Sequence, residues 1–203
     1  DQPFGWNIPN WLIRRELSEA VRTIPGTDFR PGIALTGLLP RDHEVIATLS
    51  DRSRIAARMV IAADGRDSPT RDALGIGART LRYGQKALAF AVTHPIPHGN
   101  VSTEIHRSGG PFTLVPLPDR DGQPCSAVVW METGPEAARL AALPDDAFAA
   151  EATVRSCHAM GPLTLASRRS TWPIISQIAD SLTGERSALI AEAAHVVPPI
   201  GAQ

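Results

Sequence analysis

Apolar residues recur along the chain with two different periods, which together predict both helices and strands. Between residues 11 and 22 an apolar side chain returns every three or four positions, and Asn10 just before this segment can cap a helix. Three strands are predicted next, at 30–39, 44–49 and 54–63, because turn residues separate these apolar runs. We expect the first two strands to form a hairpin. The third ends in a continuous apolar run, so we expect it to be buried on both faces.

The second half of the chain carries more strand patterns than helix patterns. Strands are predicted at 87–94, 101–107, 112–116, 127–132, 163–173 and 188–190, and helices at 135–143 and 145–160. The dipeptide Gly161-Pro162 ends the second helix, since proline cannot continue it. This mixture of strands and helices predicts an α/β fold of mixed, α+β character.

The composition of the chain excludes several classes of partner. Of the 203 residues, 43% are hydrophobic and 20% are charged, which is typical of a globular protein. The formal net charge is −1, so no basic surplus indicates nucleic acid or an anionic membrane. No apolar stretch approaches the roughly 20 residues of a membrane-spanning helix. We therefore expect a small-molecule partner and no nucleic acid.

The sharpest internal motif is residues 63–71, Ala-Asp-Gly-Arg-Asp-Ser-Pro-Thr-Arg, directly after the third predicted strand. Gly65 permits a tight turn or the close approach of a ligand to the backbone. Ser68 is a good N-cap with proline after it, so we expect a short helix whose free N–H groups favour an anion such as a diphosphate. Asp64 can accept hydrogen bonds from ribose hydroxyls. Taken alone, the motif is equally compatible with a capped turn in which Arg71 forms a surface ion pair.

A second loop pattern lies at residues 191–203. Residues 191–203 read Ala-Glu-Ala-Ala-His-Val-Val-Pro-Pro-Ile-Gly-Ala-Gln and follow a short apolar strand. The pair Pro198-Pro199 prevents regular strand pairing, and glycine follows soon after. We expect this loop to introduce a helix that lies beyond the chain, which would make the chain a central fragment of a larger protein.

Other kinds of active site lack a sequence pattern here. His94, His98 and His106 do not have the spacing of metal ligands with Cys or carboxylates, so we expect no metal site. The sequence also has no Gly-x-Ser-x-Gly elbow of a hydrolase and no Walker loop of an NTPase. The two loops are therefore the main candidates for a binding site.

The two loops resemble the FAD motifs of class A flavoprotein monooxygenases, the para-hydroxybenzoate hydroxylase superfamily. Residues 63–71 are similar to the DG motif, and residues 191–203 to the second FAD motif, Gly-Asp-Ala-Ala-His-x-x-x-Pro-x-x-Gly-Gln-Gly. The segments between them resemble the ubiquinone-biosynthesis hydroxylase branch: Tyr83-x-Gln85, Gly110-Pro111-Phe112, Val115-Pro116-Leu117 and Ser126-x-Val128-Val129-Trp130. The resemblance covers nearly the whole chain.

This resemblance implies FAD as the cofactor and NAD(P)H as a co-substrate. In the family, the acidic residue of the second motif contacts the ribitol or ribose region of FAD, and the following Pro and Gly residues bring backbone against the isoalloxazine ring. The cofactor-binding residues that it implies are Asp64, Gly65, Arg71, Glu192, Pro198, Gly201 and Ala202. It assigns no catalytic residue in this chain.

Several positions depart from the family pattern. Ala191 replaces the usual Gly and Glu192 the usual Asp, from which we expect altered geometry and not loss of binding. The sequence contains no Gly-x-Gly-x-x-Gly, the loop that the family uses for the FAD diphosphate. We therefore expect this chain alone to bind FAD weakly or not at all, and to be inactive.

Four apolar side chains are candidates for the lining of a substrate pocket: Phe112, Leu114, Trp130 and Trp172. A prenylated phenol would need such a lining, because each buried methylene group contributes about 0.8 kcal/mol. Residues of this kind are more often simply the core of a sheet.

The resemblance also implies a discontinuous architecture. A partial FAD domain (1–78 and 182–203) would flank a β-sheet substrate domain (79–181). The parent enzyme would use NAD(P)H and O₂ to hydroxylate a phenolic, prenylated ubiquinone precursor. Two alternatives stay open: a flavin monooxygenase or oxidoreductase acting on another aromatic substrate, and a non-catalytic binding or assembly module that keeps the fold.

The source and the location of the protein can also be predicted. Lys86 is the one lysine among 20 basic residues, which indicates GC-rich coding and a bacterial source. We expect a cytoplasmic protein, with an aromatic, lipid-tailed substrate and with peripheral association to the membrane or to a biosynthetic complex. The sequence does not predict an oligomeric state.

Overall fold

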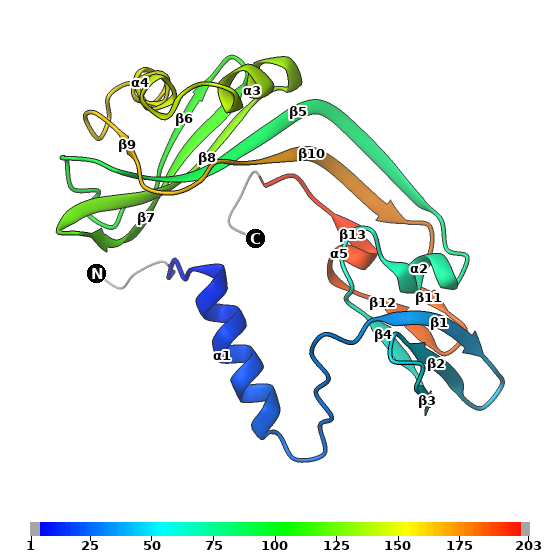
Figure 1. Ribbon diagram of the computed structural model, residues 1–203. Helices are drawn as coiled ribbons and strands as arrows, with labels where there is room; N and C mark the ends of the chain where they lie inside the picture. The colour runs from blue at the N-terminus through cyan, green and yellow to red at the C-terminus, as the bar shows by residue number, and fades with distance from the viewer. Residues whose placement is uncertain (1–4, 200–203) are drawn as a thin grey trace. The chain divides into compact units, whose positions relative to one another are not determined.

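The computed structural model describes residues 5–199, which form two compact units (Figure 1). Unit 1 consists of residues 5–9 and Arg82–Ile174, and unit 2 of Asn10–Leu81 and residues 175–199. Each unit therefore combines segments that are distant in the sequence. The functional division of the chain into an FAD part and a substrate part stays a prediction.

The largest sheet is antiparallel and lies mainly in unit 1, although the ends of β5 (Ala78–Thr93) and β10 (Ser170–Ala179) belong to unit 2. Its strands are, in spatial order, β5, β8 (Gln123–Thr133), β7 (Gly110–Arg120) and β6 (Thr103–Arg107). On the other side of β5 lies β10, and the short strand β9 (Thr164–Leu165) also pairs with β5. The four predicted strands between 87 and 132 are confirmed. The single strand predicted at 163–173 is wrong, because this segment contains β9, a break and the start of β10.

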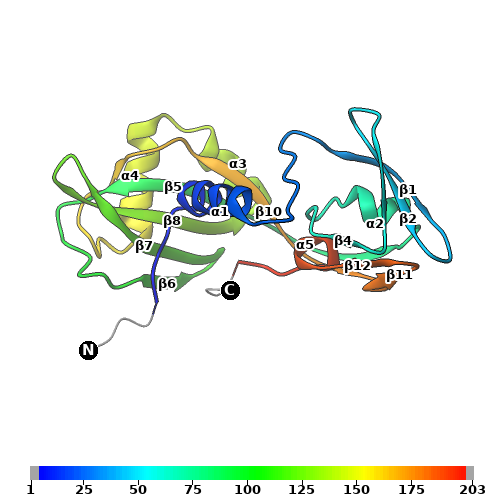
Figure 2. The same ribbon diagram turned by 90° about the horizontal axis from the view of Figure 1, so that it is seen from below.

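The core of unit 1 lies on one face of this sheet, under two helices (Figures 1 and 2). Helices α3 (Gly134–Ala141) and α4 (Asp145–Arg155) match the two predicted helices, although α4 ends earlier than expected. The strand register places Phe112 of β7 directly opposite Trp130 of β8. Their ring centroids lie 5.5 Å apart, and Phe148 of α4 packs against Trp130 at 5.8 Å. Burial of each such ring stabilises the unit by roughly 1.5–3 kcal/mol.

Unit 2 contains two small sheets. The first is antiparallel and consists of β1 (Leu35–Pro40), β2 (Val45–Leu49) and β3 (Arg54–Ala57), so the predicted hairpin is confirmed. In the second sheet, β4 (Val60–Ala62) runs parallel to β12 (Ser187–Leu189), which also pairs with β11 (Thr183–Gly184).

The third predicted strand, 54–63, is therefore wrong as one element. The chain leaves the first sheet after Ala57 and enters the second at Val60. Arg186 stabilises this break, because its carbonyl accepts the N–H of Val60 and its guanidinium donates to the carbonyl of Arg58. The expectation of burial on both faces is also wrong, since Ile61 is 61% exposed. Only one face of β4 packs against a core, through Ala62.

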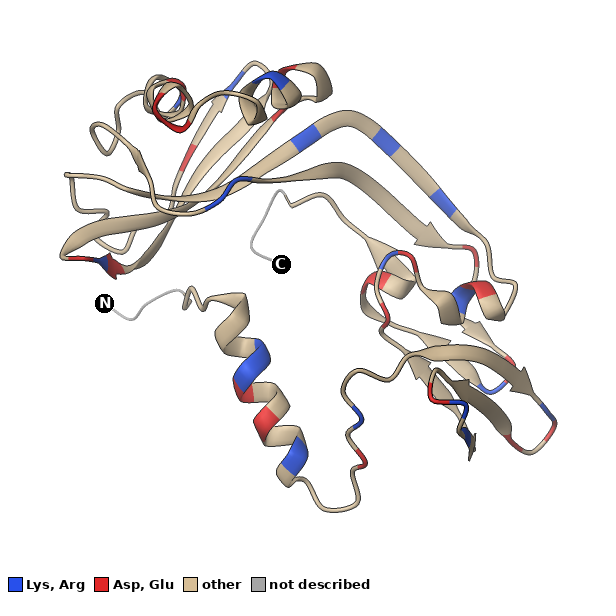
Figure 3. Cartoon of the chain, in the orientation of Figure 1, with Lys and Arg blue, Asp and Glu red and all other residues tan. Residues whose placement is uncertain are grey.

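Helix α1 (Asn10–Thr23) confirms the first predicted helix but buries none of its residues. Trp11 is 64% exposed and Leu17 is 60% exposed. Positive and negative side chains are interspersed along the helix (Figure 3). Within residues 5–199, the apolar stripe of α1 therefore has no buried contact with a core.

Candidate functional site

The two predicted binding loops follow neighbouring parallel strands of unit 2. Ala62, at the end of β4, lies opposite Leu189 of β12, and the N–H of Ile190 donates to the carbonyl of Ala62 at 2.9 Å. Residues 63–71 and 190–199 therefore leave the sheet at the same edge. The carboxyl ends of parallel strands are where open α/β sheets place ligand contacts.

The first loop has the local geometry that the sequence predicts. Gly65 has a φ of +89°, a conformation that favours glycine. Helix α2 (Pro69–Ala73) begins with Ser68 as its N-cap, and the hydroxyl of Ser68 accepts the N–H of Arg71 at 3.0 Å. The capped strand-to-helix turn is confirmed.

Asp64 organises this loop. One carboxylate oxygen accepts the hydroxyl of Ser68, and the other accepts the N–H of Thr70 at 3.0 Å. Partial burial opposes ionisation of Asp64, but the hydrogen bonds from Ser68 and Thr70 outweigh it and lower the pKa of Asp64 below its ordinary value. Asp64 is therefore a carboxylate at neutral pH.

These hydrogen bonds correct one expectation about the start of helix α2. The N–H groups of Thr70, Arg71 and Asp72 already donate to Asp64 and Ser68. They are not free for an anion, because the loop's own oxygens satisfy them first. The backbone at Gly65, in contrast, has open space beside it, since a Cβ atom at this position would meet nothing within 4 Å. A ligand can approach the loop at that point.

Arg71 is a buried side chain that connects the two loops. It is 6% exposed, so it does not form the surface ion pair that the alternative interpretation, a capped turn, implied. Its guanidinium donates to the carbonyl of Ala193 at 3.3 Å and to the carbonyl of Arg66 at 2.9 Å. The carbonyl of Arg66 also accepts Nε2 of Gln177 at 3.2 Å. The contact of Arg71 with the cofactor stays a prediction.

The second loop starts with the short helix α5 (Ala191–Ala194), which the sequence did not predict. Ala193 and Ala194 are buried in the same core as Ala62 and Leu189. Ala191 has a φ of +51°, in the left-handed region that favours glycine. The replacement of the family's usual glycine by Ala191 is therefore a strained substitution.

Glu192 reaches toward the first loop. Its carboxylate is 4.0 Å from Nε of Arg66, and 56% of its side chain is exposed. The sequence did not predict this ion pair, although Arg66 lies inside residues 63–71. The pair brings together one charged residue from each loop at the surface. Glu192 also keeps room to accept further hydrogen bonds.

A cavity of about 540 Å³ lies beside the second loop. It is lined by His195 and Val196 of β13 (His195–Val196), by Val197, and by residues of β5 and β10 that include Leu81 and Ile178. Pro198 follows directly and is partly buried. Gly201 and Ala202 lie outside the described residues. The volume is in the range of cavities that hold organic ligands.

The four predicted pocket residues lie in different environments. Phe112 is fully buried and Leu114 is 1% exposed, because both face α3 and α4 in the core of unit 1. Trp130 belongs to the same core and also lines a second cavity, whereas Trp172 is 56% exposed. Their role in a substrate pocket stays a prediction.

Within residues 5–199, no group of three or more His, Cys, Asp or Glu side chains could hold a metal ion. None of the helices in that range is long and apolar enough to cross a membrane.

The chain is similar to ubiquinone hydroxylases over nearly its whole length. Ubiquinone hydroxylase UbiL of Rhodospirillum rubrum is 33% identical over 201 residues, which cover 99% of this chain and 46% of that protein. The 3-demethoxyubiquinol 3-hydroxylase of Escherichia coli is 24% identical over 199 residues, 98% of this chain and 50% of that protein. The chain thus spans about half the length of these curated relatives.

The solved structures agree on the fold. CmlS, a flavin-dependent halogenase, matches with a TM-score of 0.76 at 16% identity, over 93% of this chain and 36% of that one. This likeness confirms the predicted mixed α/β fold, and the ubiquinone hydroxylases confirm the predicted resemblance to class A flavin monooxygenases. A family described as FAD binding domain matches residues 4–203, and this chain belongs to it.

Proposed function

We propose that the protein containing this chain is an FAD-dependent hydroxylase of a phenolic substrate. One observation carries the proposal: the two loops that resemble FAD motifs leave adjacent parallel strands at one sheet edge, where Arg71 joins them through the carbonyl of Ala193. Arg71 and Ala193 are 122 residues apart in the sequence, so this buried hydrogen bond is a tertiary contact. It supports the inference that the two loops form one binding site.

The residues at this edge fit part of an FAD molecule. Glu192 offers an exposed carboxylate that can accept hydroxyl groups of the ribitol or ribose. Gly65 has open space where a side chain would stand, so a ligand can lie against its backbone. The cavity beside the second loop has apolar walls from Leu81, Ile178 and Val196, which suit one face of a flat ring system.

We assign the roles of these residues accordingly. Glu192 orients the sugar chain of FAD, and Arg66 holds the carboxylate of Glu192 in place. Asp64 fixes the first loop, because both of its oxygens bind Ser68 and Thr70. Bound FAD would supply the redox chemistry, with NAD(P)H as reductant and O₂ as the source of the added oxygen. The chain's share is binding, orientation and exclusion of water by the cavity walls.

The names of two relatives support a substrate class for the proposed hydroxylase. The relatives at 33% and 24% identity are a ubiquinone hydroxylase and a demethoxyubiquinol hydroxylase. We infer a lipid-tailed phenol as the substrate class, taken up in the cytoplasm at the membrane surface. We further assign the sheet of unit 1 to the substrate side and the two loops of unit 2 to the FAD side.

The test is a turnover assay of the full-length protein with FAD. Reduced nicotinamide, O₂ and a short-chain prenylated phenol are supplied, and the product is identified by mass spectrometry. We expect nicotinamide oxidation that depends on the phenol and a product that has gained one oxygen atom. Oxidation with no hydroxylated product would favour an oxidoreductase on another aromatic, and absence of bound flavin would favour a non-catalytic module.

A further inference from the structure

Strand β6 forms one edge of the largest sheet, in the part that belongs to unit 1 (Figures 1 and 2). It pairs with β7 on one side, and no strand within residues 5–199 pairs with its other side. The strand reads Thr-Glu-Ile-His-Arg, and Glu104, His106 and Arg107 are exposed. An open edge presents backbone N–H and C=O groups to another strand, so this edge is a candidate interaction surface.

The backbone groups of Glu104 and His106 face the open side of β6. His106 lies opposite Pro111 of β7, and proline has no N–H to donate to it, so this position fits a pair without hydrogen bonds. Such pairs alternate with bonded ones along an antiparallel ladder, so the next pair, Ile105 with Phe112, is bonded. Glu104 then repeats the orientation of His106. Each of these two residues keeps one N–H and one C=O for a further strand.

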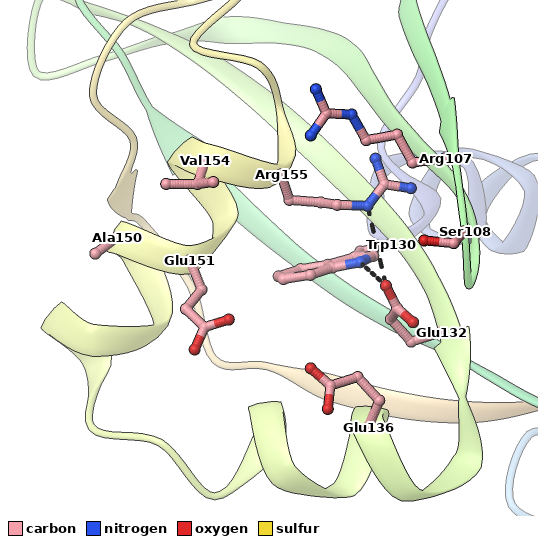
Figure 4. A pocket seen from close by; sticks show the side chains of 9 residues that line it. All are labelled: Arg107, Ser108, Trp130, Glu132, Glu136, Ala150, Glu151, Val154 and Arg155. Atoms are coloured by element: carbon pink, nitrogen blue, oxygen red, sulfur yellow. Dashed lines mark hydrogen bonds and ion pairs between the residues drawn. The ribbon is translucent and has the colours of Figure 1, made fainter.

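The inner side of this hairpin is held by Arg155, which reaches from the end of α4 toward the turn after β6 (Figure 4). The Arg155 side chain is 9% exposed, and its terminal nitrogens donate to the carbonyls of Ile105, at 3.4 Å, and Gly110. Glu132 lies 3.9 Å from Nε of Arg155 and supplies the counter-charge of this buried cation. The edge is therefore ordered before a partner arrives, which reduces the entropy lost on association.

The sequence of β6 contains few of the features that protect edge strands against pairing. It has no lysine and no proline, and its register with β7 is regular over all five residues. Protected edges use such residues, or bulges, to keep a second strand away. The formal net charge of the chain is −1, so two copies do not repel each other strongly. The edge is open to a strand whose charges match its own.

The side chains of β6 match those of a second, antiparallel copy of the same strand. Glu104 and His106 stand on one face, where Nε2 of His106 lies 3.0 Å from Oε1 of Glu104. In a two-fold pairing centred on Ile105, Glu104 of each copy lies opposite His106 of the other. A pairing centred on Glu104 instead sets two glutamates opposite each other, where like charges repel. The charges therefore favour the register centred on Ile105.

We propose that β6 is a self-association edge, at which two copies of the protein pair antiparallel about Ile105. Glu104 and His106 of each copy then form hydrogen-bonded backbone pairs with His106 and Glu104 of the other, with an acid beside an imidazole in each pair. The surface belongs to unit 1 alone and does not involve the two flavin loops. Because two five-residue strands form a small interface, we expect a weak dimer with a Kd of about 100 µM.

Two single variants and their mixture test this pairing in the full-length protein. Glu104→Lys sets a lysine opposite His106, and His106→Glu sets a glutamate opposite Glu104, so each variant should self-associate about tenfold more weakly. An equimolar mixture restores opposite charges at both pairs, so it should form a heterodimer at least as tight as the unaltered dimer. Sedimentation velocity at several concentrations measures the association. Both positions are exposed, and circular dichroism checks that each variant is folded.

Glu185→Lys and His43→Glu are the matched controls, since they make the same charge changes at exposed positions outside β6. Neither variant should alter self-association, and their mixture should associate no more strongly than the unaltered protein. A full-length protein that stays monomeric up to about 1 mM would overturn the proposal. Equal self-association of Glu104→Lys and Glu185→Lys would overturn it as well. So would a mixture of the two β6 variants that associates no better than either variant alone.

Discussion

Arg71 and Ala193 are linked by a hydrogen bond of 3.3 Å from the buried guanidinium to the backbone carbonyl. The same guanidinium binds the carbonyl of Arg66 at 2.9 Å, so one side chain fixes the backbone of both loops. Arg66 in turn lies 4.0 Å from Glu192. The relation between the two loops is therefore built into the core of unit 2 and does not depend on a ligand.

Arg71→Met should destabilise the chain by roughly 2 kcal/mol, because the carbonyls of Ala193 and Arg66 lose a charged donor. The free energy of unfolding from urea titration measures this effect. Arg14→Met is the matched control, since Arg14 is exposed on α1, and it should change the free energy of unfolding by less than about 0.5 kcal/mol. Equal effects of the two substitutions would show that Arg71 does not hold the loops together.

Ala191→Gly should stabilise the chain by roughly 1 kcal/mol. At a φ of +51° an alanine is strained, and glycine removes this strain at a smaller entropic cost in the unfolded state. Ala138→Gly, at an exposed position in α3, should have the opposite sign and cost about 1 kcal/mol. Destabilisation by both substitutions would contradict the strained backbone at Ala191.

The turn between β6 and β7 should not tolerate a side chain at Gly109. A Cβ atom there would overlap with the carboxylate of Glu132, whose side chain is nearly buried and pairs with Arg155. We expect Gly109→Ala to lower the thermal midpoint well beyond Gly122→Ala. Gly122 also has a positive φ but meets nothing within 4 Å, so its substitution should cost roughly 1 kcal/mol. Similar midpoints for the two variants would argue against close packing at Gly109.

His94 should make the stability of unit 1 depend on pH. It is 3% exposed and lies 2.9 Å from both the carbonyl of Ile96 and the hydroxyl of Ser126. Burial lowers its pKa below the ordinary 6.5, an effect that the carbonyl of Ile96 opposes and nearby His98 reinforces. The unfolded chain then binds more protons below pH 6.5, so stability falls as the pH drops through this region, by at most about 1.4 kcal/mol per pH unit.

The measurement is the free energy of unfolding against pH for two variants. His94→Asn should flatten the profile below pH 6.5, while His43→Asn, at an exposed position, should leave its slope unchanged. A profile of His94→Asn that is as steep as that of the unaltered chain would refute the assignment.

Local features of the fold and of the site could be predicted from the sequence, because neighbouring residues determine them. Ser68 caps α2 as its position before proline indicates, and Gly65 adopts the positive φ that its place in the turn suggests. The hairpin of β1 and β2 follows from its turn residues in the same way.

Features that depend on distant partners could not be predicted. Ile61 sits in an apolar run that looks like a buried strand, yet β4 has a packed neighbour on one face only. The burial of Arg71 depends on Ala193, and the ion pair of Arg66 depends on Glu192. Phe112 fits both a pocket and a core by composition, and only the position of α3 and α4 places it in the core.

The central claim is that the two loops form one side of an FAD site, and FAD affinity of the full-length protein tests it most directly. We expect the unaltered protein to hold flavin, seen by its visible absorbance, and Glu192→Ala to bind FAD about tenfold more weakly. Glu185→Ala, an exposed acid outside the loops, should bind FAD as the unaltered protein does. A full-length protein without flavin after reconstitution, or equal affinity in the two variants, would contradict the account.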